Sequence, residues 1–161
     1  MDKEQLRQRR LANLKRMLKP RHVAFVGGQG MAGPMQHCIA GGFQGAIWPV
    51  NPKYPEIAGR KTFPSVDALP EAPDATFVAV PRELAIEVIG ALSKRGAAGA
   101  VCYAAGFAEL GDEGRAMQQK LVEASGEMAM IGPVSYGLLN YVDGVTMFAS
   151  GPGGGRVERG A

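Results

Sequence analysis

Short apolar runs alternate with helical patterns along most of this chain. The runs are almost continuously hydrophobic, whereas between them apolar residues recur every three or four positions. Uninterrupted apolar runs are typical of strands that are buried on both faces of a parallel sheet. The strands predicted in this way span residues 22–26, 46–50, 75–80, 100–104 and 128–131, with 145–148 as a sixth.

The predicted helices lie between those runs, and glycine follows each of them. Pro34–Ala40 has proline in its first turn and stops at Gly41. Arg82–Lys94 and Asp112–Ser125 each place apolar residues on one face and end near a glycine. This alternation predicts an α/β fold: a Rossmann-like, doubly wound, mainly parallel sheet with helices on both faces.

The first 20 residues differ in composition from the rest. Residues 1–21 hold eight Lys or Arg and two acids, so most of the positive charge of the chain lies there, while the remainder carries a net charge of −3. Leucines at near-helical spacing, without interleaved aromatic residues, favour an amphipathic helix packed on the domain over a nucleic-acid-binding arm. We expect this basic helix over 1–20, a Rossmann-like domain over 21–149 and a Gly-rich linker over 150–161.

Length and composition exclude several classes of protein. The chain has 161 residues, 46% of them hydrophobic and 20% charged, which suits one globular domain. No apolar run is long enough for a membrane span, and the basic N-terminus has no apolar stretch like that of a secretory signal. We therefore expect a cytoplasmic protein without membrane contacts. Cys38 and Cys102 make no disulfide framework, and with His22 and His37 they show no metal-ligand spacing.

A glycine motif follows the first predicted strand. Gly28-Gln29-Gly30-Met31-Ala32-Gly33 matches G-x-G-x-x-G and leads into a helix, as a phosphate-binding turn requires. Without side chains, backbone N–H groups approach an anion closely, and the helix N-terminus adds partial positive charge. The motif predicts a phosphate-bearing ligand; the alternative is that these glycines serve only a tight turn.

The end of the second predicted strand indicates which phosphate ligand fits. A dinucleotide such as NAD is usually met there by an acid that binds its ribose hydroxyl. This chain has Val50-Asn51-Pro52-Lys53 instead, and its next acid is Glu56. Lys53 suits a ribose that carries an extra phosphate, as in NADP or coenzyme A; the alternative is a solvated loop lysine.

Several motifs in order carry a family resemblance. The most distinctive are Arg21-His22-Val23-Ala24-Phe25-Val26-Gly27, Val50-Asn51-Pro52-Lys53 and Ala105-Gly106-Phe107-Ala108-Glu109. Over residues 17–149 the chain resembles the coenzyme A (CoA)-binding domain of ADP-forming (NDP-forming) acyl-CoA synthetases, a family related to the alpha subunit of succinyl-CoA synthetase. The resemblance implies a Rossmann-like domain followed by others that carry a phosphorylated histidine and a nucleotide-grasping site.

The resemblance also implies which residues contact CoA. The glycine loop would hold the phosphates, the end of the second strand would meet the adenosine, and later loops would line the pantetheine arm toward the thiol. In chain order, the implied contacts are Gly27, Gly28, Gln29, Gly30, Asn51, Pro52, Lys53, Val80, Pro81, Ala105, Gly106 and Phe107. No catalytic residue is implied within this chain.

Two positions depart from the family's pattern. Ala104 stands where the family often has serine, and Gly132-Pro133-Val134-Ser135-Tyr136-Gly137 replaces Gly-Pro-Asn-Cys-x-Gly. In the family the second segment lies close to the reactive end of CoA. These changes point to a different acyl substrate or to a weak enzyme, and they affect CoA binding less.

The function that we expect is CoA binding within an acyl-CoA synthetase, a ligase. ATP, ADP and Mg would bind only to domains absent from this chain, so the chain by itself would be inactive. The glycine-rich end, Gly151–Gly155, resembles the approach to a second domain. Alternatives are a stand-alone CoA sensor or an NADP-dependent oxidoreductase domain. Partners would be further domains of the synthetase, and the sequence is compatible with a homo-oligomer without determining one.

Overall fold

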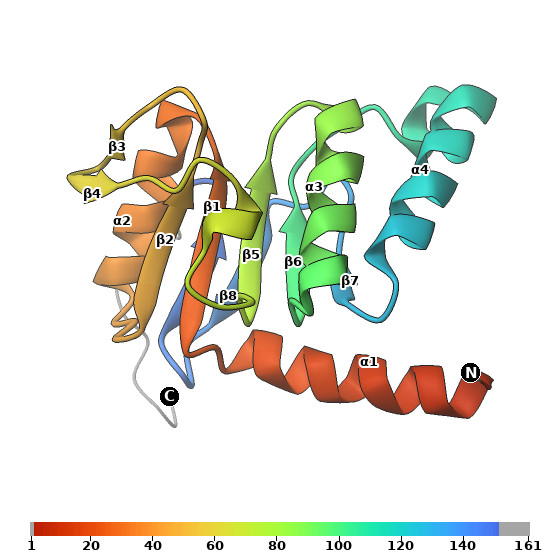
Figure 1. The fold of residues 1–161 in the computed structure, drawn as a ribbon, viewed down its shortest axis with the longest axis horizontal. Helices are drawn as coiled ribbons and strands as arrows, with labels where there is room; N and C mark the ends of the chain where they lie inside the picture. Colours follow the sequence, from red (N-terminus) through yellow and green to blue (C-terminus); the bar gives the residue numbers. More distant parts are fainter. Residues whose placement is uncertain (1, 152–161) are drawn as a thin grey trace.

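A five-stranded parallel sheet forms the centre of the molecule in the computed structural model, which describes residues 2–151 (Figure 1). The strands run in the spatial order β2-β1-β5-β6-β7, and every neighbouring pair is parallel. The predicted α/β class and the five predicted sheet strands are confirmed, with ends shifted by up to two residues. The observed strands are β1 His22–Gly27, β2 Ala46–Val50, β5 Ala75–Ala79, β6 Gly99–Cys102 and β7 Ala129–Ile131.

Helices cover both faces of this sheet, as predicted. On one face, α3 (Arg82–Arg95) and α4 (Asp112–Ser125) pack against each other and over the strands. The opposite face is covered in part by α2 (Ala32–Ala40), whose Met35 and Cys38 are buried. Within residues 2–151, the 3-10 turns η1 Gln29–Met31 and η3 Ala108–Leu110 precede α2 and α4, and η2 Val66–Ala68 precedes β5.

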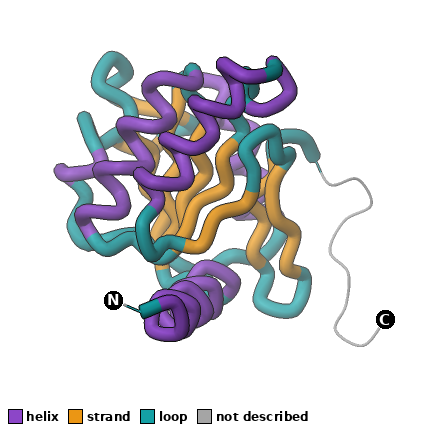
Figure 2. Tube along the Cα trace, turned by 90° about the vertical axis from the view of Figure 1, so that its right-hand side faces the viewer, coloured by secondary structure: helices purple, strands orange, loops and turns teal. Residues whose placement is uncertain are grey.

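Two small antiparallel hairpins lie outside the main sheet. The predicted strand Val145–Phe148 is confirmed as β9, but it pairs with β8 (Gly137–Asn140), which the sequence pattern did not reveal. This hairpin packs beside α2, where buried Val145 and Met147 complete the core that one nine-residue helix leaves uncovered. Figure 2 shows the hairpin as a separate pair of strands beside the main sheet. The other hairpin joins β3 Glu56–Ile57 to β4 Arg60–Lys61.

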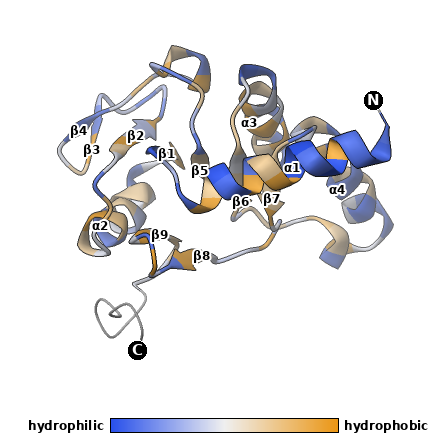
Figure 3. Cartoon of the chain, turned by 90° about the horizontal axis from the view of Figure 1, so that it is seen from below, coloured by the Kyte–Doolittle hydropathy of each residue, from blue (hydrophilic) through white to orange (hydrophobic). Residues whose placement is uncertain are grey.

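The N-terminal helix α1 (Lys3–Leu18) crosses below the amino ends of the strands (Figure 1). Asp2 begins it with a capping box, and Met17 near its end is fully buried. Its N-terminal part is the most hydrophilic, as the view from below shows (Figure 3). None of the helices within residues 2–151 combines the length and apolar character that crossing a membrane demands.

The buried carboxylate of Asp74 links α1 and the start of β1 by hydrogen bonds at the amino edge of the sheet. Asp74 is only 2% exposed and accepts hydrogen bonds from the guanidinium groups of Arg16 (2.8 Å) and Arg21 (3.0 Å). Its own backbone N–H donates to Nδ1 of buried His22, at 3.1 Å. Burial alone would raise the pKa of Asp74, but the hydrogen bonds from Arg21 and Arg16 outweigh it and hold the pKa below its ordinary value.

Candidate functional site

The strand order reverses between β1 and β5, which makes their carboxyl ends the first place to look for a site. From β1 the chain crosses to β2 on one side, whereas β5, β6 and β7 follow on the other. The loops after β1 and β5 therefore diverge and leave a crevice between them. Two hollows open at this crevice, and both are lined by Gly28, Val80 and Pro81.

The glycine loop after β1 contains two kinds of glycine. A Cβ atom on Gly27 would lie 2.8 Å from Cγ of Met31 and 3.0 Å from the carbonyl oxygen of Ala79, so the fold itself requires glycine there. A Cβ on Gly28 would meet nothing closer than a ring carbon of Tyr54 at 3.8 Å, and one on Gly30 would meet nothing within 4 Å. Since internal packing does not require glycine at these two positions, the open space beside them is available to a ligand.

Asn51, at the end of β2, fixes the glycine loop from the side. Its Nδ2 donates to the carbonyl oxygen of Gly27 at 2.8 Å, and its Oδ1 accepts from the backbone N–H groups of Lys53 (2.7 Å) and Tyr54 (3.1 Å). This side chain therefore holds two loops of the crevice in register. Its polar atoms are engaged by the protein, which makes it a positioning residue for the loop.

The first hollow, which we call the lysine hollow, lies between β1, β2 and α3. It has a volume of about 510 Å³, within the range of small-molecule sites. Among its described lining residues, Lys53 is positively charged, whereas Asp67 and Glu87 are acidic. The predicted site residues that line it are Gly27, Gly28, Asn51, Pro52, Lys53, Val80 and Pro81.

The second hollow, which we call the tyrosine hollow, lies on the other side of Gly28, Val80 and Pro81. Its volume is about 700 Å³, and none of its described lining residues is charged. Aromatic, aliphatic and hydroxyl side chains come from η1 after β1, from β5, from the loop after β6 and from the segment after β7. They include Met31, Phe77, Tyr103, Ala105, Val134, Ser135 and Tyr136.

Three predicted contacts lie outside both linings. The side chain of Gln29 donates to the carbonyl oxygen of Glu56. Phe107 is fully buried in the core, and Gly106 is held at both backbone groups, by Arg82 at its carbonyl oxygen (2.8 Å) and by Glu109 at its N–H. Gly106 and Phe107 thus shape the loop that carries Ala105, which does reach the tyrosine hollow.

Sequence reasoning did not identify Tyr54 or Tyr103, and it named Tyr136 only within a segment that the resemblance places near the reactive end of CoA. Tyr54 lines the lysine hollow, whereas Tyr103 and Tyr136 line the tyrosine hollow. Tyr103 directly follows β6, and Tyr136 lies in the segment that departs from the family's pattern. Tyr103 lies near the end of the predicted strand 100–104, where packing explains an aromatic residue equally well, and Tyr54 and Tyr136 lie in loops that follow predicted strands.

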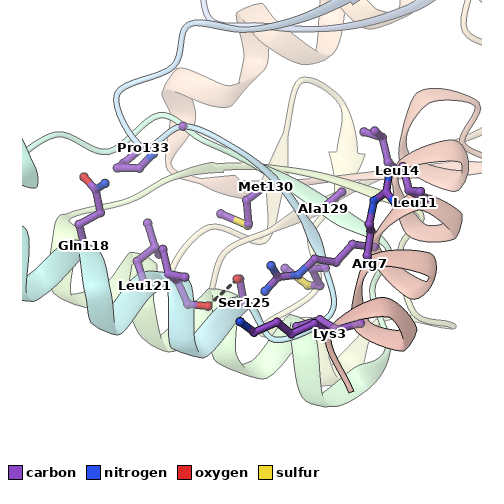
Figure 4. A pocket seen from close by; sticks show the side chains of 15 residues that line it. Lys3, Arg7, Leu11, Leu14, Gln118, Leu121, Ser125, Ala129, Met130 and Pro133 are labelled. Carbon is purple, nitrogen blue, oxygen red and sulfur yellow. Dashed lines mark hydrogen bonds between the residues drawn. The ribbon is translucent and has the colours of Figure 1, made fainter. Parts of the chain in front are cut away.

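A third hollow, of about 600 Å³, lies between α1, α4 and β7, away from the crevice (Figure 4). Lys3 and Arg7 reach along it from α1 toward Ser125 of α4, and Leu11 and Leu14 supply apolar surface (Figure 4). It has no glycine loop. Among residues 2–151 we also find no group of three His, Cys, Asp or Glu side chains that could hold a metal ion.

The two cysteines are buried thiols. Cys38 lies on the buried face of α2 and Cys102 ends β6, and neither is exposed. Burial raises the pKa of Cys38 to about 11, and burial also raises that of Cys102. Because the thiolate is the nucleophile, neither residue suits nucleophilic chemistry at neutral pH.

Comparisons with known proteins identify a family. The family described as "CoA binding domain" matches residues 28–140, which include most of the lining residues of both hollows. The chain is 36% identical to a trans-feruloyl-CoA synthase of an unknown prokaryotic organism over 149 residues, 87% of this chain. It is 33% identical to an ADP-forming acetate–CoA ligase of Archaeoglobus fulgidus over 132 residues, 79% of this chain.

A solved structure supports the same relationship. The dinucleotide-forming acetyl-coenzyme A synthetase 1 of Ca. Korarchaeum cryptofilum, in complex with phosphate and ADP, superposes with a TM-score of 0.77 at 28% identity. The match covers 84% of this chain and 30% of that one. The chain spans about a fifth of the length of the two curated relatives, 21% and 19% respectively.

Proposed function

This chain belongs to the family of CoA-binding domains, and from that membership we propose that it binds CoA across the β1–β5 crevice as one domain of an ADP-forming acyl-CoA synthetase. The glycine loop receives the diphosphate, because Gly28 and Gly30 leave room for oxygen atoms beside the backbone. Lys53 meets the ribose phosphate in the lysine hollow, and the pantetheine arm passes Val80 and Pro81 toward Ala105.

One observation carries this proposal: a hollow lined by charged residues and a hollow without them meet at Gly28, Val80 and Pro81. CoA has a matching division into a phosphorylated nucleotide and a long, uncharged arm. The space beside Gly28 and Gly30 suits the diphosphate between those parts, and Lys53 suits the phosphate on the ribose. NAD fits less well, since the end of β2 offers Lys53 where an acid would bind its free ribose.

The curated relatives are longer than this chain, which spans about a fifth of the first two. We propose that a protein of several domains joins an acid to CoA with formation of ADP, as the names of these ADP-forming relatives state, and that nucleotide and Mg bind outside this domain. Further domains or subunits of this synthetase are the expected partners, and a cytoplasmic location and homo-oligomer formation are part of the same proposal. The relatives differ in the acid that their names carry, so the acyl group has to be argued from this chain's own residues.

The test is calorimetric titration of this chain with CoA, 3′-dephospho-CoA, NADPH and NAD. We expect CoA to bind most tightly. The Lys53→Ala variant should lose about fivefold in CoA affinity, about 1 kcal/mol, and bind CoA no better than it binds dephospho-CoA. Lys61→Ala removes an exposed lysine from β4 and serves as the control that leaves both affinities unchanged.

Two outcomes would contradict the proposal. Tighter binding of NADPH than of CoA would favour an oxidoreductase domain. Binding of CoA without any dependence on Lys53 would leave the ligand in place but move its ribose phosphate elsewhere.

A further inference from the structure

Aromatic rings form a continuous row beside the tyrosine hollow. Phe77 and Tyr103 have ring centroids 6.1 Å apart, Tyr103 and Tyr136 meet edge to face at 6.1 Å, and Tyr136 lies 6.3 Å from Phe148. Tyr103 is 43% exposed, Tyr136 is 63% exposed and neighbouring Val134 is 52% exposed. One exposed apolar side chain is ordinary, but three grouped at one hollow indicate a surface that a ligand covers.

The backbone presents Tyr136 to the hollow in a fixed way. The N–H of Val134 donates to the carbonyl oxygen of Ala104 (3.1 Å), and the N–H of Ala149 donates to the carbonyl oxygen of Tyr136 (2.8 Å). Gly137, the next residue, has a φ of +137°, and a Cβ there would lie 2.0 Å from the carbonyl oxygen of Met147. The tyrosine-bearing segment is thus anchored to the end of β6 on one side and to β9 on the other.

Charge determines which end of CoA reaches this hollow. The described lining of the tyrosine hollow contains no charged residue, whereas Lys53 lies in the other hollow. The diphosphate is proposed to bind at Gly28 and Gly30, on the border of this hollow, and moving the ribose phosphate past them into the uncharged, largely apolar remainder without a partner costs free energy. The uncharged thiol end, with any acyl group bound to it, is the end that fits beside Tyr103 and Tyr136.

We propose that the tyrosine hollow is an acyl subsite and that Tyr103 and Tyr136 select a planar aromatic acyl group carried as a CoA thioester. This inference rests on the proposed CoA-binding function. An aromatic ring packs against the two tyrosine rings in edge-to-face or offset geometry, which saturated groups of the same size do not reproduce. An acetyl group would leave both rings exposed.

The test compares thioesters that differ only at the acyl group, by calorimetric titration of this chain. The probes are benzoyl-CoA, cyclohexanecarbonyl-CoA, acetyl-CoA and free CoA. We expect benzoyl-CoA to bind about tenfold more tightly than acetyl-CoA, with cyclohexanecarbonyl-CoA in between. Equal affinities of the benzoyl and cyclohexanecarbonyl thioesters would overturn the aromatic selection, because the hollow would then respond to apolar volume alone.

Variants at Tyr136 connect the preference to this residue. Tyr136→Ala should abolish the advantage of benzoyl-CoA over acetyl-CoA while the affinity for free CoA stays within about twofold, and Tyr136→Phe should keep the advantage. Tyr141→Ala, which removes a half-exposed tyrosine from the β8–β9 turn, is the matched control. An unchanged benzoyl preference in Tyr136→Ala would refute the role of this residue.

The two proposals fail in different ways. If free CoA does not bind, the proposed function fails. If free CoA binds but all thioesters bind alike, CoA binding stands and the acyl subsite is refuted.

Discussion

The two edges of the central sheet have opposite character. At the amino edge, Asp74 joins α1, β1 and the start of β5, and Arg16, Arg21 and His22 surround it with hydrogen bonds. At the carboxyl edge, loops diverge around two hollows, and the open space beside Gly28 leaves room for a ligand. Around Asp74 the amino edge is closed by the protein's own groups, whereas the carboxyl edge has unfilled space on both sides of Gly28.

We therefore expect residues at the amino edge to contribute mainly to stability and residues at the carboxyl edge mainly to ligand binding. Charged groups at the amino edge satisfy one another, so their removal leaves neighbours without partners and lowers the free energy of unfolding. Exposed side chains at the carboxyl edge, such as Lys53 and Tyr136, stabilise the fold less, so their removal changes it little. Substitutions at the two edges should therefore affect different measurements.

The largest effect on stability is expected at Asp74. Asp74→Ala removes the acceptor of Arg16, Arg21 and the Arg21 backbone N–H, and we expect it to lower the free energy of unfolding by about 2–3 kcal/mol. Urea denaturation measures this loss, and titration below the unfolding transition should give unchanged CoA affinity. Asp112→Ala, at a nearly fully exposed carboxylate of α4, is the control and should cost about 0.5 kcal/mol or less.

The pH dependence of the Asp74 contribution follows from its lowered pKa. The contribution is fully present above the pKa of an unfolded aspartate, about 3.9, and is lost as pH falls through the lower pKa of the folded state. The stability difference between the wild type and Asp74→Ala should therefore shrink below about pH 4. A difference that stayed constant on acidification would show that the carboxylate charge contributes nothing.

Gly28 should show the opposite behaviour. Its φ of −85° suits alanine, and the added Cβ would have its nearest neighbour at 3.8 Å, so Gly28→Ala should leave the melting temperature unchanged or slightly raised. The methyl group would enter the proposed diphosphate site, and we expect CoA affinity to fall about tenfold, or about 1.4 kcal/mol. Gly90→Ala, with a neighbour at the same 3.8 Å but within α3, should leave affinity unchanged. An equal affinity in both variants would place the phosphates elsewhere.

Asn51 should be an exception to this division, because its substitution should affect both stability and CoA binding. It lies at the carboxyl edge, yet its side chain makes three hydrogen bonds within the protein. Asn51→Ala should lower the free energy of unfolding by about 1 kcal/mol and weaken CoA binding about threefold, because the glycine loop loses its support. Gln44→Ala removes an exposed amide bonded to the Gly42 carbonyl and should change neither quantity. Loss of affinity without loss of stability would instead indicate direct contact between Asn51 and CoA.

Local pattern was sufficient for most of the fold. Continuous apolar runs located the five sheet strands, and glycine after each helical pattern located the helix ends within two residues. The β8–β9 hairpin was not predicted from the sequence, because Gly137–Asn140 is short and only half-buried. Its pairing with Val145–Phe148 depends on the space left beside α2. The expected linker over 150–161 lies outside the described residues except for its first two positions.

The candidate site was only partly visible in the sequence. The glycine motif and Lys53 were recognisable because backbone access and a cation at a strand end have a direct chemical meaning. The different roles of Gly27 and Gly28 were not recognisable in the sequence, because they depend on tertiary contacts. Met31 and Ala79 lie close to Gly27 but not to Gly28. Nor could the sequence distinguish Ala105, which reaches a hollow, from Phe107, which fills the core.

By itself the sequence determined the alternation of strands and helices, the basic N-terminal helix and a glycine-rich turn after the first strand. These features depend on residues close together in the chain, where hydrophobic period and glycine content act directly. Tertiary structure alone decided that Tyr103 and Tyr136, 33 positions apart, share one uncharged hollow, and that Asp74 closes the opposite edge. Strand order brings such residues together, and strand order results from packing the whole chain around one core.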